Sequence, residues 1–102
     1  DIERGATREL DAAGRLVLPA FVNGQLHACK AFWRRKLAEP PSPQAHARFG
    51  AARAVRAAYT PEDVFARAGE AVRLAVLNGT CAIRLFADVD EVTGLRALEG
   101  LF

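Results

Sequence analysis

The chain has 102 residues, of which 51% are hydrophobic and 25% are charged, and its formal net charge is +2. This composition is typical of one soluble globular domain and excludes a disordered or fibrous chain. No apolar run approaches the roughly 20 residues that span a bilayer, and the opening DIERG lacks the basic and apolar segments of an export signal. We therefore expect a soluble, cytoplasmic protein with no membrane partner.

The charges are unevenly distributed along the chain. Residues 30–56 carry seven basic side chains and one acid, whereas residues 57–102 carry four basic side chains and seven acids. This asymmetry is expected either where a basic segment meets an anionic partner or where two segments of one chain attract each other. The stretch AFWRRK places two aromatic rings beside three cations, which can bind nucleic acid, but it is short and isolated, so we expect a solvated surface there.

The first predicted elements are short strands. The stretch TRELDAAGRLVLPAF at residues 7–21 alternates around Leu10, turns at Ala13-Gly14 and resumes as an apolar LVL, which predicts two short strands joined by a glycine turn. Pro19 then interrupts any ladder, because proline has no N–H group. We expect residues 1–19 to form a short β segment and residues 20–102 to form the main α/β unit, both in one compact body.

A third strand and a first helix follow. Residues 20–27 predict a strand whose unbroken apolar start indicates burial on both faces. The proline-rich EPPSP at residues 39–43 cannot continue a helix or a central strand. Residues 44–59 predict a helix despite Gly50, because alanine and arginine are strong helix formers.

The clearest helix signal covers residues 61–77. Thr60 offers an N-cap, Pro61 suits the first helical position, and the two acids that follow favour the positive end of the helix dipole. Apolar residues then recur at helical spacing, and Asn78-Gly79 predicts the C-terminal end.

The remaining residues predict a strand and a helix. Residues 81–89 have the character of a buried strand, and residues 92–101 place leucines three apart, as a helix does. A helix, a tight loop, a strand and a helix in this order are typical of an α/β fold with parallel strands. Cys29 and Cys81 would then lie at opposite ends of neighbouring strands, too far apart for a disulfide, and two lone thiols fit a reducing compartment.

The sequence holds two histidines, His27 and His46, as candidate metal ligands. On a strand, Gln25, His27 and Cys29 point to the same side, and a Cys thiolate is a good ligand for zinc or iron whereas a Gln amide is a poor one. Two candidate ligands do not close a site, so the interpretation of His27 as a strand-end histidine with one hydrogen bond is preferred over metal binding.

Three charged residues in and after the strand at residues 81–89 are also candidates for function. Asp88 and Asp90 could orient a catalytic group, although Asp90 is well placed to cap the next helix. Arg84 lies within the apolar strand, where a charge needs a partner, so we expect an ion pair with an acid or with an anionic ligand, and prefer the former.

Two phrases of the sequence resemble the amidohydrolase superfamily. LDAAGRLVLPAFVNGQLHACKAFWRRKL is similar to the N-terminal segment of cytosine deaminases and N-isopropylammelide isopropylaminohydrolase. There a small β domain leads through a GRLVLPGFV phrase into the first strand of a (β/α)8 barrel, which ends in H-x-H-x-D-K-A. YTPEDVFARAGEAVRLAVLNGTCAIRLFADVDEVTGLRALEGL is similar to the next helix, strand and helix of the same enzymes.

The resemblance implies a divalent zinc or iron ion whose bound water attacks C–N bonds of cyclic nitrogen compounds. His27 matches the second histidine of the metal-binding pair. Gln25, Cys29 and Phe86 stand where the family has the first histidine, the aspartate after the pair and the histidine of the later phrase. The remaining ligands of the family come from later strands, which residues 1–102 do not include.

A (β/α)8 barrel takes about 250 residues. The expected fold is therefore a partial barrel segment with short N-terminal strands, two parallel strands and about three helices. Its expected partner is the remainder of a barrel or a second copy of the chain.

Two functions of different classes remain open. The first is a segment or truncated homologue of a metal-dependent amidohydrolase, inactive as an isolated chain, with His27 as the one metal contact and no cofactor expected for this chain alone. The alternative is a non-catalytic, self-associating α/β module whose exposed strand edge is its working surface. No residue receives a general-base role, so whether the chain is an enzyme stays open.

Overall fold

The computed structural model describes residues 8–40 and 44–102, and the side chains of residues 45–48 lie outside the description. The elements follow in the order β1 (Phe21–Leu26), the 3-10 turns η1 (Ala28–Lys30) and η2 (Trp33–Lys36), α1 (Ala45–Ala57), α2 (Pro61–Leu77), β2 (Thr80–Leu85) and α3 (Arg96–Glu99). Among the described residues, no helix is long and apolar enough to cross a membrane. The predicted helices at residues 44–59 and 61–77 are confirmed.

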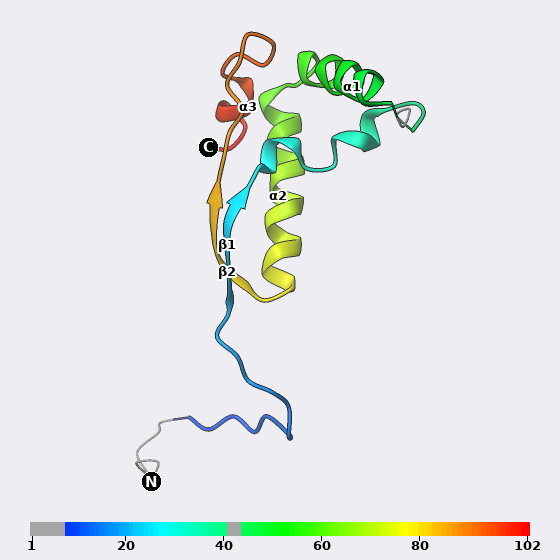
Figure 1. Cartoon of the computed structure of the whole chain (residues 1–102). Helices are drawn as coiled ribbons and strands as arrows, with labels where there is room; N and C mark the ends of the chain where they lie inside the picture. The colour runs from blue at the N-terminus through cyan, green and yellow to red at the C-terminus, as the bar shows by residue number, and fades with distance from the viewer. Residues whose placement is uncertain (1–7, 41–43) are drawn as a thin grey trace.

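The two strands form a parallel sheet, as predicted. Phe21 pairs with Thr80 at one end and Leu26 pairs with Leu85 at the other. α2 connects the strands and runs alongside both of them (Figure 1). The fold is therefore α/β, with an open two-stranded sheet and three helices in the described part of the chain.

Local signals explain why α2 begins and ends where it does. The Thr60 hydroxyl oxygen accepts a hydrogen bond from the Asp63 backbone N–H at 3.2 Å, and Pro61 occupies the first helical position. Gly79 follows the C-cap with a φ of 87°, a conformation that favours glycine. The tight turn at Gly79 then sends the chain back as β2 beside β1.

The core lies at the upper end of the molecule in Figure 1, where α1, α2 and α3 meet η1. Its buried residues come from five segments: Cys29, Val55, Tyr59, Val64 and Ala97. The aliphatic part of the core is small, and partly buried Trp33, Leu37 and Leu101 extend it. Most of the packing thus lies at the end of the sheet where both strands terminate.

Arg67 ties η1 to α2 within this core. Its guanidinium donates hydrogen bonds of 2.7 Å to the carbonyl oxygens of Cys29 and Ala31, and it also pairs with Asp63 one turn earlier on α2. The Arg67 Cζ lies 4.6 Å from the centroid of the Tyr59 ring. A buried arginine satisfied in this way fixes the chain that leaves β1.

The predicted strands within residues 8–18 are absent. Residues 8–20 form no strand; a turn forms at Ala13-Gly14, where the Asp11 carboxylate accepts a hydrogen bond from the Ala13 N–H at 2.7 Å. A strand is stable only beside a partner, and no described segment pairs with these residues. Residues 1–7 of the predicted β segment and residues 41–43 of the predicted breaker lie outside the described residues.

The predicted burial of both strands was wrong. Phe21 and Val22 of β1 are 61% and 71% exposed, and Leu85 of β2 is 41% exposed. The reason is that, within the described part of the chain, the sheet has two strands, so α2 covers one face and the described segments leave the opposite face open (Figure 1).

The predicted helix at residues 92–101 is shorter than expected, since α3 spans only Arg96–Glu99. The residues before it form a turn closed by an isolated bridge between Asp90 and Gly94, and Gly94 has a φ of 56°. The Asp90 carboxylate accepts hydrogen bonds from the backbone N–H groups of Val92 and Thr93, which hold this turn and compete with helix formation there.

Candidate functional site

A polar cluster lies at the C-terminal ends of both strands, and Asp88 is at its centre. The Asp88 carboxylate is 3.3 Å from His27 Nδ1 and 2.8 Å from Lys30 Nζ, and Arg56 NH1 lies 3.9 Å away. The Asp88 side chain is only 14% exposed. One carboxylate therefore gathers side chains that follow β1 and side chains from α1.

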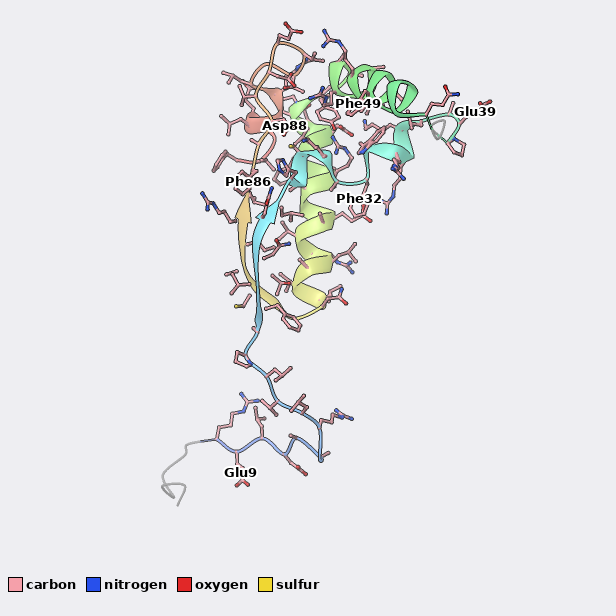
Figure 2. All side chains as sticks on the ribbon, viewed as in Figure 1. Glu9, Phe32, Glu39, Phe49, Phe86 and Asp88 are labelled. Atoms are coloured by element: carbon pink, nitrogen blue, oxygen red, sulfur yellow. The ribbon has the colours of Figure 1, made fainter. Side chains whose placement is uncertain are left out.

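The His27 ring is held on two sides. It stacks on Phe86 with a centroid distance of 5.5 Å and an interplanar angle of 28°. Phe86 follows β2, and its N–H extends the ladder by donating to the Leu26 carbonyl oxygen at 2.9 Å. Figure 2 shows Phe86 and Asp88 beyond the end of β2, next to the segment that follows β1. Ring stacking and the Asp88 contact together define the orientation of His27.

Asp90 holds the turn above this cluster and does not cap α3. Its Oδ1 accepts hydrogen bonds from the N–H groups of Val92 and Thr93 and from the Thr93 hydroxyl, and its Oδ2 accepts one from Arg56 at 2.6 Å. The backbone hydrogen bond from Thr93 is the main cause that lowers the pKa of Asp90 to about 2. The prediction that Asp90 caps the following helix was therefore wrong, because its side chain binds the backbone of the turn that precedes α3.

The expected ion pair of Arg84 is not found among the described residues. Arg84 is exposed, and its Cζ lies 5.1 Å from the centroid of the Phe86 ring. The prediction was wrong because it assumed a buried strand, and an exposed guanidinium needs no buried acid.

The expected row of Gln25, His27 and Cys29 on one side of a strand was wrong. β1 ends at Leu26, and η1 then turns Cys29 away from the strand and into the core. Cys29 is wholly buried, and its thiol points to the Phe86 carbonyl oxygen at 3.8 Å, while Gln25 is exposed on β1. Both cysteines are free, as expected, and the other histidine, His46, lies within α1.

A metal ion fits only part of this arrangement. Asp88 beside Nδ1 of His27 favours the tautomer that leaves Nε2 with its lone pair, and carboxylate–histidine pairs of this kind support metal-bound histidines. However, no three His, Cys, Asp or Glu side chains among those described, in residues 8–40, 44 and 49–102, are grouped to hold an ion. A zinc or iron site needs three or four ligands, so the other ligands of an ion at His27 would have to come from outside these side chains.

Sequence reasoning identified His27 and Asp88 separately and missed that they meet. It also missed Lys30, Arg56 and Thr93 as members of the cluster. Lys30 lies three residues after His27, and Asp88 lies two residues after Phe86. The available signal was that both segments follow the carboxyl ends of predicted parallel strands, which meet at one edge of a sheet.

Comparisons with protein-family models, with characterised proteins and with solved structures found no match for this chain. The likeness to amidohydrolases therefore rests on the two sequence phrases alone.

Proposed function

We propose that this chain supplies the first β/α units of a (β/α)8-type amidohydrolase that acts on C–N bonds of cyclic nitrogen compounds. The two sequence phrases that resemble cytosine deaminases support this proposal. The parallel β1, α2 and β2 are also the unit from which such barrels are built.

The observation that carries the proposal is the pairing of His27 with Asp88. Both follow the C-terminal ends of parallel strands, the end at which barrel enzymes assemble their sites. An imidazole oriented by a carboxylate and by ring stacking is suited to holding a metal ion or a polar ligand through Nε2. In the proposal, His27 is one contact and the residues of further strands provide the others.

The isolated chain is then incomplete as a catalyst. His27 stands alone where the family has a pair, and Gln25 is a poor ligand in the other position. Purified protein should accordingly bind well under one equivalent of zinc or iron. One equivalent of bound zinc or iron per chain would contradict the interpretation that the metal site has lost part of its ligand set.

Restoring the pair tests the proposal directly. In the variant Gln25→His, two histidines are separated by one residue, as in the family, and we expect zinc affinity to rise about tenfold or more, as for a second ligand. The measurement is competition for zinc against a coloured chelator.

Asn23→His is the matched control for this experiment. It adds a histidine to the same strand, four residues and about 13 Å from His27, which is too far for both to bind one ion. Its zinc affinity should equal that of the wild type. Equal affinities of the two variants would refute the family relation at this site.

Exposed apolar surface favours a second candidate, self-association without catalysis. Phe21 and Val22 are exposed on β1, and the extended residues 8–20 expose four apolar side chains: Leu10, Leu16, Val17 and Leu18. Unpaired strand edges next to such side chains readily pair with another chain. In this alternative, a second copy covers the sheet and the polar cluster has a structural role.

A further inference from the structure

A pocket of about 250 Å³ opens beside the polar cluster, between the turns that follow β1 and helix α1. It is distinct from the His27 end of the cluster, because His27 and Asp88 do not line it. The lining residues are Lys30, Trp33, Phe49, Ala52, Arg56 and Tyr59.

Three aromatic rings form the apolar part of this pocket. Tyr59 is 2% exposed, Trp33 is partly buried, and Phe49 is 75% exposed (Figure 2 labels Phe49 on α1). Aromatic walls favour a flat ring, which can stack or lie edge to face against them. Since an apolar cavity of ~150 Å³ holds benzene, the available volume suits one aromatic ring with a small substituent.

Two cations provide the polar part. Lys30 Nζ contacts Asp88 at 2.8 Å. In the described contacts of Arg56 with Asp88 and Asp90, the guanidinium uses its NH1 group. An ammonium has three donors and a guanidinium has five, so both groups retain N–H donors beyond those contacts. The two aspartates hold the cations in place before a ligand arrives, which reduces the entropy lost on binding.

We propose that this pocket binds a planar aromatic carboxylate. The ring contacts the aromatic walls, and the carboxylate accepts charge-assisted hydrogen bonds from Lys30 and Arg56. The proposal goes beyond the proposed function, because it requires neither a metal ion nor further barrel strands.

Trp33 is the only tryptophan of the chain, so its fluorescence reports on the pocket. The probe is 4-nitrobenzoate, whose nitroaromatic ring quenches tryptophan emission at short range, and 4-nitrobenzamide is the neutral comparison of nearly equal shape. We expect the carboxylate to bind about tenfold more tightly, the usual effect of one hydrogen bond to a charged group. Equal affinities, or quenching without saturation by either probe, would overturn the proposal.

Two substitutions test the ring contacts and the carboxylate contacts of the ligand separately. Lys30→Gln should reduce the preference for 4-nitrobenzoate over 4-nitrobenzamide about threefold, because one of the two cationic donors is lost while Arg56 remains. Phe49→Ala should weaken the binding of both probes about equally, because the lost ring contacts the aromatic part of each. Phe49 is largely exposed, so the fold tolerates the change.

Arg53→Gln is the matched control. Arg53 lies on α1 like Arg56, is exposed and pairs with Glu91 at 3.2 Å, but it does not line the pocket. Its variant should bind both probes as the wild type does. If Arg53→Gln reduces the preference as much as Lys30→Gln, the effect is one of overall charge and the proposed site is wrong.

Discussion

At the residue scale, two aspartates organise the end of the sheet. Asp88 faces His27 and Lys30, and Asp90 faces Arg56 and the backbone of the following turn. The sequence indicates both acids by their position after an apolar strand. It does not indicate their contacts with His27, Lys30 and Arg56, because these three residues lie more than 30 residues away along the chain.

The low pKa of Asp90 predicts a loss of stability in acid. The folded-state pKa is about 2, below the ordinary 3.8, so the stabilisation is complete above the ordinary pKa and disappears as pH falls from about 4 through about 2. Asp90→Asn keeps an acceptor oxygen but cannot titrate, so its stability should fall less over this interval. Urea unfolding of both proteins between pH 5 and pH 2 measures the difference. Parallel curves would contradict the assigned role of Asp90.

At the element scale, close contact between α3 and α2 decides how the C-terminal segment packs. A Cβ atom added at Gly100 would lie 2.5 Å from the Pro61 carbonyl oxygen and 2.6 Å from Val64 Cβ. Val64 is wholly buried, so neither neighbour can move aside easily. A glycine is therefore required at this position for the end of α3 to lie against the start of α2.

Gly100→Ala should lower the free energy of unfolding by about 1–3 kcal/mol, the usual effect of overpacking. The control is Gly69→Ala on the exposed side of α2, where an added Cβ meets no atom within 4 Å. This control should raise stability by about 0.5–1 kcal/mol, because alanine is the better helix former. Thermal unfolding followed by circular dichroism measures both. Gly100→Ala at or above wild-type stability would show that α3 does not pack as described.

At the scale of the whole molecule, the chain is elongated. Its radius of gyration is 19.4 Å, whereas a compact domain of this length has about 13 Å. Residues 8–20 extend away from the helices in Figure 1, and Figure 2 shows Glu9 far from the polar cluster. A two-stranded sheet with an uncovered face is marginal by itself, so under both proposed functions we expect an additional partner for this sheet.

Self-association is the outcome expected for the purified chain. Sedimentation velocity across a range of concentrations should show a species of at least two chains, and Val22→Lys should shift it toward monomer by placing a charge on exposed β1. Phe65→Lys is the control, because Phe65 is similarly exposed but lies on α2. A wild-type chain that stays monomeric at all concentrations would contradict association through the sheet.

The sequence by itself determined the elements whose signals are local. α2 was predictable because its cap, its first-turn proline and its terminal Asn-Gly all lie within or beside the helix. The parallel pairing of β1 and β2 followed from the helix between them. The number of helices was predictable for the same reason, and the free state of both cysteines followed from the expected parallel order of the strands.

Only the tertiary structure decided burial and partnership. The apolar runs of β1 and β2 predict buried strands, but exposure depends on how many neighbours cover a sheet, which no local pattern contains. Cys29 turns into the core because η1 begins right after β1, and His27 meets Asp88 across 61 residues because two parallel strands end side by side. Contacts of this range arise only when the whole chain has packed, so their pattern is absent from any single segment.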